Sequence, residues 1–409
     1  MRSRHNNTQG LWPRRRSRAE TVDQIFSTRN VVTVDDSMVK PNPIRDSANK
    51  LKLSIFGVNG KGAAFTHHPD RFSGDWDEIS RLAKRADQLG IEGFVSASRW
   101  RAFGGDGHYS GDVMETFAWA GAIAAITERI SIISTFPMSL INPAFVAKAE
   151  ATVDLISGGR AGMNLVCGWF PPEFELFGVP MQEHNDRYGY ADKWMEVFDK
   201  LWSSDEGFDL KNEYFDVKNA MSQPRPLQSR PVLLNAGGSP RGREFAAQHA
   251  EVAFTIPDDP DPQAVKARVA EYREEARKKF GKEIQIWLSA YVVQKDTTAE
   301  AEAYAQDYIV TRGDDIAVAD LIEANIPNAK TMPPEKMAEM SYEFKAGYGA
   351  YPLVGTASDI AQRMKELSEA GVDGLMLIWL DYEQGLEKLA GEVLPRLEEA
   401  GLRRPATAG

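Results

Sequence analysis

The stretch that decides the fold is DLISGGRAGMNLVCGWFPPEFELFGVPMQEHNDRY, residues 154–188. Its first part, LISGGR, is typical of a helix end, because Gly158 and Gly159 can adopt the positive φ that closes a helix. The next part, AGMNLVCGW (161–169), predicts a short buried strand. Asn164 lies within that apolar strand, and a buried amide needs hydrogen-bond partners or a ligand. The stretch therefore predicts both a helix-to-strand unit and a candidate binding residue.

Outward from this stretch, apolar strand-like segments alternate with segments of helical periodicity. The other segments that predict strands are 51–59, 91–98, 130–136, 231–237, 251–256, 284–293 and 374–380. Helical spacing of apolar residues predicts helices at 76–90, 113–127, 143–156, 187–203, 243–250, 262–280 and 358–371. Strands that are apolar on both faces are typical of a parallel sheet covered by helices. Eight such units predict an α/β fold, a closed (β/α)₈ TIM barrel with insertions.

An open, doubly wound sheet is the alternative architecture for such a pattern. It often binds a dinucleotide through a Gly-x-Gly-x-x-Gly turn after the first strand. GVNGKG (57–62) stands at that place, but its glycine spacing is wrong and it leads into a long loop. The barrel is therefore preferred.

The domain organisation follows from where this alternation starts and stops. We expect one barrel domain at 51–400, between a flexible N-terminal extension (1–50) and a short C-terminal tail (401–409). Met38 could also be the true start, which leaves it open whether the residues before it belong to the native protein. Segment 310–352 interrupts the alternation as an insertion, either a lid over the barrel mouth or a structural arm or dimer contact.

Composition narrows the class of protein. With 48 basic and 59 acidic residues, the formal charge of −11 disfavours broad nucleic-acid binding. No apolar stretch reaches the ~20 residues that a membrane span needs. The single cysteine, Cys167, excludes an intrachain disulfide and indicates a reducing compartment, so we expect a cytoplasmic protein. Cys167 itself is interpreted as a small buried residue rather than a nucleophile.

Polar residues recur where the predicted strands end, which is where a barrel enzyme places its active site. Ser98 and Arg99 end the second predicted strand, Thr135 ends the third, and Asn164 lies in the fourth. Any one of them is explained by ordinary loop structure. Together, at successive strands of one barrel, they predict a binding site at the mouth.

Two further motifs offer groups for an anion. In NAGGSPRGREFAAQHA (235–250), Ser239 can cap the following helix, whose first N–H groups then face outward toward a phosphate. A capped helix without a ligand is the alternative. In HNDRY (184–188), Arg187 can make a paired contact with a phosphate or carboxylate, and Tyr188 can hydrogen-bond or stack.

In their order along the chain, these motifs resemble the bacterial-luciferase-like flavin monooxygenases. Gly-Trp after the strand is similar to the branch that contains pyrimidine and dimethyl-sulfone monooxygenases. The resemblance implies an FMN site, with the phosphate near Ser239 and the Arg187–Tyr188 pair. The position of Arg99 carries lysine in the pyrimidine monooxygenases, which leaves the shape of the oxygen pocket open. The FMN contacts that it implies are Ser98, Arg99, Asn164, Glu173, Arg187, Tyr188 and Ser239.

The resemblance also implies the reaction. It indicates an FMNH₂- and O₂-dependent monooxygenase that inserts oxygen into a small organic substrate through a peroxyflavin, with FMNH₂ supplied by a separate NAD(P)H:flavin reductase. Arg99, Thr135 and Asn164 are the expected catalytic residues, with Arg99 stabilising developing negative charge. Heterocyclic amides, sulfones and haloaromatic compounds are open as substrates. No metal is assigned, and a homodimer or homotetramer is expected.

Two other functions compete with this one. The first is a deazaflavin-dependent oxidoreductase on the same barrel, and the second is a flavin-binding protein without turnover. His67, His68 and His108 lie in loops after the first two predicted strands and could reach a substrate. A solvent-facing loop histidine is the simpler interpretation of each.

Overall fold

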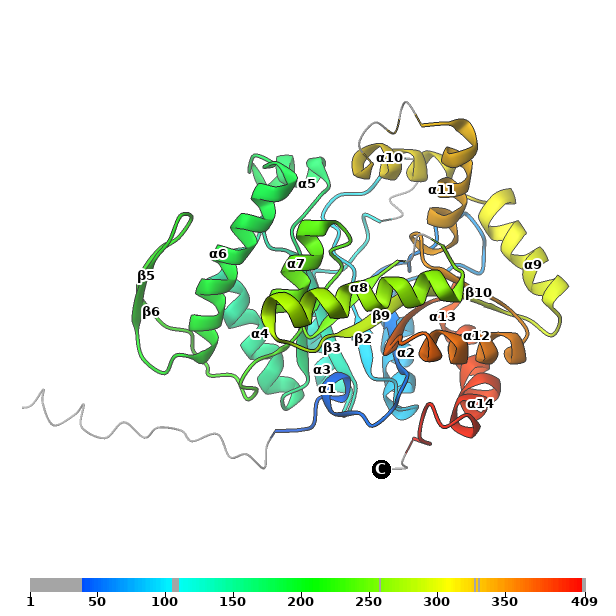
Figure 1. The fold of residues 1–409 in the computed structure, drawn as a ribbon, viewed down its shortest axis with the longest axis horizontal. Helices are drawn as coiled ribbons and strands as arrows, with labels where there is room; N and C mark the ends of the chain where they lie inside the picture. The colour runs from blue at the N-terminus through cyan, green and yellow to red at the C-terminus, as the bar shows by residue number, and fades with distance from the viewer. Residues whose placement is uncertain (1–38, 105–109, 257–258, 327–328, 330–331, 407–409) are drawn as a thin grey trace, which may run out of the picture. The chain divides into compact units, whose positions relative to one another are not determined.

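Short, apolar strands form the centre of the protein and pair in parallel. In the residues that the computed structural model describes (39–104, 110–256, 259–326, 329 and 332–406), eight strands close a barrel in the order β1-β2-β3-β4-β7-β8-β9-β11. The last strand pairs back to the first, with Leu53 opposite Leu375. This is the TIM barrel that the sequence predicts (Figure 1). The strands are β1 Lys52–Phe56, β2 Gly93–Val95, β3 Ser131–Pro137, β4 Ala161–Val166, β7 Val232–Asn235, β8 Val252–Thr255, β9 Gln285–Gln294 and β11 Gly374–Ile378.

Helices follow the strands and pack around the barrel (Figure 1). Those predicted from periodicity are α2 Trp76–Gln88, α3 Thr116–Ile126, α4 Pro143–Ser157, α6 His184–Ser203, α7 Pro240–His249, α8 Pro262–Phe280 and α12 Ala357–Glu369. Local chemistry sets their ends. The carboxylate of Asp75 accepts a hydrogen bond from the N–H of Glu78 at the start of α2, and Gly158 closes α4 with φ of 74°.

Several elements were not predicted. A two-stranded hairpin of β5 Phe208–Lys211 and β6 Asp216–Ala220 separates α6 from β7. Strand β10 Tyr351–Gly355 pairs with the second half of β9. The other helical elements are α5 Pro171–Phe177, α9 Thr298–Gln306, the π-helix Asp307–Thr311, α10 Asp315–Asn325, α11 Pro334–Gly347, α13 Tyr382–Lys388, the π-helix Leu389–Val393 and α14 Leu394–Glu399. Helices α10 and α11 occupy segment 310–352, and whether they act as a lid stays a prediction.

Alternation along the strands separates two kinds of core. Residues such as Leu53 and Ile132 belong to the cluster that includes the helices, whereas Val95, Ile133 and Met376 belong to a cluster inside the barrel. Thr135 lies two residues beyond Ile133 on the same face of β3, and there the barrel interior changes from apolar to polar. The barrel is therefore filled with apolar side chains at its amino end and opens into polar groups at its carboxyl end.

The N-terminal boundary differs from the prediction. The sequence assigns residues 1–50 to a flexible extension, but Pro43–Asp46 forms the short helix α1, which Asn42 caps. Ile44 is fully buried and packs with Val95 and Ile133 in the interior cluster. An apolar side chain inside a barrel outweighs the polar character of the sequence around it. Figure 1 shows α1 at the end of the molecule opposite α10 and α11.

The C-terminal boundary also differs. Residues 401–409 are expected to form a tail, but Leu402 and Arg403 are buried. Arg403 forms an ion pair with Glu92 at 2.8 Å, with side chains only 3% and 2% exposed. A buried charge needs such a partner, and the arginines of a short terminal segment give no sign of one at the sequence level. No helix in the described part of the chain combines the length and apolar character that a membrane span requires.

Candidate active site

Thr135 and Asn164 form a buried polar chain where β3 and β4 reach the barrel mouth. They are paired across the two strands, and the Asn164 side-chain N–H₂ donates to the Thr135 hydroxyl at 3.2 Å. That hydroxyl donates to the carbonyl of Ser96 at 2.5 Å. The structure thus brings together two of the three residues expected to be catalytic.

The carbonyl oxygen of Asn164 ends this chain. It is buried and has no hydrogen-bond partner among the described residues. Such an unsatisfied group costs about 1–3 kcal/mol, so proteins seldom retain one without a use. An N–H group of a bound ligand would satisfy it.

Arg99 and Glu173 form a buried ion pair next to this mouth. A guanidinium nitrogen of Arg99 lies 3.0 Å from a Glu173 oxygen, with side chains 8% and 6% exposed. The same oxygen accepts the backbone N–H of Trp100, and the other guanidinium nitrogen donates to the Tyr348 hydroxyl at 3.1 Å. Glu173 is held by α5, which begins right after the Trp-Phe-Pro-Pro corner. Arg99 is therefore a charge-balanced cation and not an isolated one.

Aromatic rings enclose this ion pair. The guanidinium carbon of Arg99 lies 4.4 Å from the ring centre of Phe103, 5.0 Å from that of Trp169 and 5.3 Å from that of Phe170. Rings at these distances stabilise a cation and keep water away from it. We call these three rings and the Tyr348 phenol the Arg99 cage. Burial raises the pKa of Tyr348, so its hydroxyl is protonated near neutral pH.

Tyr348 is the main site residue that the sequence did not reveal. It follows α11, more than two hundred positions after Arg99, and has φ of 63°, a conformation uncommon for residues other than glycine. Its neighbour Gly349 suggests a turn, but no sequence signal connects that turn with the second strand. Ser98, the other residue expected at this strand end, is half-buried.

The beginnings of α6 and α7 meet at the second part of the site. The Ser239 hydroxyl accepts the N–H of Gly242 at 3.0 Å and lies 3.3 Å from a ring nitrogen of His184. A Cβ on Gly242 would come within 2.6 Å of the Tyr188 hydroxyl, so only glycine lets the two helices approach this closely. A Cβ on Gly238 would meet nothing within 4 Å among the described atoms, so the chain is open there.

Arg187 and Tyr188 are neighbours in sequence but face different ways. Tyr188 packs against Phe245 of α7, with ring centres 5.7 Å apart. Arg187 donates to the carbonyl of Gln182 and lines a cavity of about 320 Å³ with Ile141 and other residues of the β3–α4 loop. Burial lowers the pKa of Arg187. Tyr188 therefore lies next to the start of α7, whereas Arg187 faces the cavity beside the β3–α4 loop.

The histidines differ among themselves. The side chain of His68 is 8% exposed. One ring nitrogen accepts the N–H of Asp70, and the other lies 3.3 Å from a carboxylate oxygen of Asp307. These contacts give His68 a structural role. His67 is about half exposed. His108 lies outside the described residues. Within the described part of the chain, no group of three His, Cys, Asp or Glu side chains is arranged to hold a metal ion.

A closed parallel barrel with buried polar groups at the carboxyl ends of its strands defines a TIM-barrel enzyme. Comparison with known families makes the class specific. The model of the luciferase-like monooxygenases matches residues 53–374, most of the chain. The chain belongs to the luciferase-like monooxygenase family, as its motifs predict.

Two curated relatives match nearly the whole barrel. The pyrimidine monooxygenase RutA of Acinetobacter baylyi is 27% identical over 351 residues, which are 84% of this chain and 94% of that protein. The FMNH₂-dependent dimethylsulfone monooxygenase of Pseudomonas putida is 29% identical and is covered to 97%, with 87% of this chain. The protein is thus an enzyme of the flavin-dependent monooxygenase class.

A solved structure supports the fold independently. Riboflavin lyase RcaE, in complex with modified FMN and riboflavin, superposes with a TM-score of 0.77 at 24% identity. The alignment covers 88% of this chain and 94% of that one. At this level of identity the likeness concerns the fold alone.

Proposed function

We propose that the protein is an FMNH₂- and O₂-dependent monooxygenase that inserts oxygen into a small organic substrate. The observation that carries this proposal is the polar chain from Ser96 through Thr135 to Asn164, which ends in a buried carbonyl oxygen without a described partner. In a barrel of this family, such an acceptor at the mouth fits an N–H of a flavin ring.

The residues present fit FMN at both of its ends. Asn164 would accept a hydrogen bond from the ring, and the open start of α7 at Ser239 would hold the phosphate, with Tyr188 beside it. Glu173 and Ser98 would lie at the ring end, and Arg187 would lie toward the phosphate end. When bound and reduced, the flavin supplies the electrons that activate oxygen.

The protein's own groups would prepare the site for this chemistry. The Thr135 hydroxyl donates its hydrogen bond to the carbonyl of Ser96. Its lone pairs therefore face the Asn164 amide and fix the orientation of that side chain. The Arg99 cage keeps a guanidinium group in a largely dry environment, where its charge acts more strongly than in water. Glu173 balances that charge and holds Arg99 in one position.

The dimethylsulfone monooxygenase relative is FMNH₂-dependent, which supports an external supply of reduced flavin. We therefore propose a separate NAD(P)H:flavin reductase as partner. The named relatives act on a pyrimidine and on a sulfone, which supports a heterocyclic amide or a sulfone as substrate. A haloaromatic substrate, a cytoplasmic location and a homodimer or homotetramer stay predictions.

Ser239→Asp tests the phosphate end. A carboxylate at the start of α7 should repel a phosphate and weaken FMN binding about tenfold or more, whereas Ser239→Ala should weaken it only a little. Fluorescence titration with FMN and with riboflavin, which has no phosphate, measures both effects. The Ser239→Asp change should spare riboflavin, and undiminished FMN affinity would exclude the helix start as the phosphate site.

Turnover tests the reaction. The purified protein, a flavin reductase, FMN and NADH should consume a heterocyclic amide or a sulfone only when oxygen is present. Replacing FMN by a reduced deazaflavin distinguishes the monooxygenase from the competing deazaflavin-dependent oxidoreductase. Consumption of a substrate with the deazaflavin in the absence of oxygen would favour the oxidoreductase, since that cofactor transfers hydride. FMN binding without consumption of any compound would instead favour a flavin-binding protein.

A further inference from the structure

The loop between β1 and α2, residues 57–75, encloses a second cavity at the carboxyl end of β1. Its volume is about 380 Å³, which suits a small ligand. Lys61, His67, Arg71 and Ser73 contribute to its walls, with Phe72 as an apolar side. None of these residues belongs to the FMN contacts proposed above.

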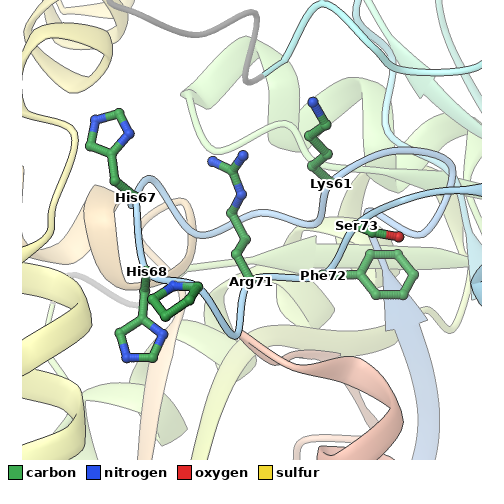
Figure 2. Close-up of a pocket in the computed structure, with 7 residues that line it drawn as sticks. Lys61, His67, His68, Arg71, Phe72 and Ser73 are labelled. Atoms are coloured by element: carbon green, nitrogen blue, oxygen red, sulfur yellow. The ribbon is translucent and has the colours of Figure 1, made fainter.

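The cationic groups of this loop converge. Figure 2 shows the side chains of Lys61, His67 and Arg71 extending to the same side of the loop, while His68 turns to the other side. Three donors from positions up to ten residues apart thus face one space. We call this space the β1-loop pocket.

The three groups are held in place by different contacts. A guanidinium nitrogen of Arg71 donates to the carbonyl of Thr66 at 2.8 Å, which fixes the position of the guanidinium group. Lys61 lies 2.6 Å from Asp112, whose side chain is 57% exposed. His67 lies 3.6 Å from Asp314. Because Asp112 is well solvated, its pairing with Lys61 is weak and can yield to a ligand.

The side chains that line the pocket are basic or neutral, and the carboxylates of Asp112 and Asp314 that pair with Lys61 and His67 are not among them. The chain as a whole carries −11, yet within the described residues no acidic side chain is among those that line this pocket. A concave site lined by one sign of charge concentrates ligands of the other sign. Arginine and lysine together are the usual partners of carboxylate, sulfonate and phosphate oxygens.

The pocket adjoins the Arg99 cage. Phe65, two residues before His67, lies 5.7 Å from the ring centre of Phe103 and 5.8 Å from that of Tyr348. One short segment therefore forms the border between the proposed oxygenation site and the cationic walls.

We propose that the β1-loop pocket binds an anionic group, a carboxylate or sulfonate, of the substrate. The proposal rests on the monooxygenase function proposed above and narrows its substrate class to heterocyclic amides or sulfones that carry a negatively charged group. The phosphate of FMN shares this chemistry, so the test separates the two sources.

Methanesulfonate and dimethyl sulfone are suitable probes, because they have nearly the same shape and differ in charge. Ligand-observed NMR titration of the FMN-loaded protein gives the affinity for each. We expect methanesulfonate to bind at least tenfold more tightly. Equal affinities for the two compounds would overturn the proposal.

Two variants locate the binding. Lys61→Ala and Arg71→Gln should each weaken methanesulfonate binding threefold or more and leave dimethyl sulfone unchanged, while Arg71→Lys should retain most of the affinity. Lys278→Ala is the control, since Lys278 forms an exposed ion pair with Glu274 on α8 and does not line the pocket. Unchanged methanesulfonate affinity in both Lys61→Ala and Arg71→Gln would also overturn the proposal.

FMN titration of the same variants completes the test. We expect wild-type FMN affinity in Lys61→Ala and Arg71→Gln. A tenfold loss of FMN affinity there would assign the pocket to the cofactor's phosphate and overturn the substrate assignment. If the protein binds no FMN at all but still prefers methanesulfonate in a way that depends on Lys61, the pocket stands and the proposed monooxygenase function fails.

Discussion

Arg99 shows how one residue can have both a structural and a chemical role. Its guanidinium group is the cation expected to stabilise negative charge, but in the structure it is paired with Glu173 and enclosed by rings. A balanced, buried charge changes the electrostatics of a site without being mobile. The pair, and not Arg99 alone, is the functional unit at this strand end.

Arg99→Ala should abolish oxygenation and lower the free energy of unfolding by about 3–5 kcal/mol, because Glu173 is left as an unpaired buried charge. Some FMN binding should remain, since the proposed phosphate contacts, Tyr188 and Ser239, are unchanged. Urea denaturation of Arg99→Ala, Glu173→Ala and the double variant measures the coupling. Additive losses would contradict a coupled pair, and native turnover in Arg99→Ala would exclude its catalytic role.

Cys167 should be unreactive in the folded protein. Burial raises the pKa of its thiol to about 12, although the positive charge of Arg187 partly opposes this, so almost no thiolate is present at pH 8. Its side chain is also buried. Ellman's reagent should label the single thiol in urea but not in buffer. Rapid stoichiometric labelling of the native protein would contradict this prediction.

At the scale of elements, the barrel strands and the helices that cover them were predictable because each is long or strongly apolar. The hairpin β5–β6 was not, because its burial alternates between half-buried and exposed and its residues are largely polar. Helix α1 was missed because four residues give no periodicity, and its only strong signal is Ile44. Tertiary burial, which one sequence cannot show, decides all of these elements.

Helix α4 carries a carboxyl group that destabilises the protein at high pH. Glu150 is fully buried, and the nearby Ser134 hydroxyl only partly offsets the cost of charging it there. Burial, with repulsion from Asp154, raises the pKa of Glu150 well above its ordinary value of 4.5. The folded state therefore retains a proton that the unfolded state releases. The contribution of Glu150 to the free energy of unfolding is therefore complete below the pKa that this carboxyl has in the unfolded chain, and it decreases as the pH rises above that value.

Glu150→Gln should accordingly gain stability relative to the wild type as the pH rises. We expect the difference in Tm, variant minus wild type, to be larger by a few degrees at pH 8 than at pH 5. Differential scanning calorimetry at both values measures it. Glu399→Gln, at an exposed position, is the control and should show no such trend. A difference independent of pH would show that Glu150 ionises alike in both states.

At the scale of the whole molecule, the described N-terminal residues belong to the barrel. Residues 37–409 form one compact unit, and Ile44 is among the buried side chains inside the barrel. Deleting residues 1–36 should leave the Tm and the FMN affinity unchanged. Deleting residues 1–46 should lower the free energy of unfolding by about 2–5 kcal/mol, the usual loss when a large core side chain is removed. Similar stability of the two truncated proteins would refute a role for α1.

The candidate site was only partly accessible from the sequence. The resemblance supplied Asn164, Thr135, Ser239 and Tyr188 because they occur in recognisable local motifs. The partners that define their chemistry come from elsewhere in the chain. Tyr348, which ends α11, contacts Arg99 from a distant part of the chain. The basic side chains of the β1-loop pocket come together only when their loop folds back on itself. Local motifs thus predict individual contacts, whereas long-range closure determines the environment in which they act.

The pairing of β1 with β11 joins two segments from near opposite ends of the chain. During synthesis on the ribosome, the first strand has to wait for the last before the sheet can close, so its free edge stays exposed through most of translation. Nascent chains of this protein are therefore expected to need a chaperone's protection until β11, Gly374–Ile378, has emerged.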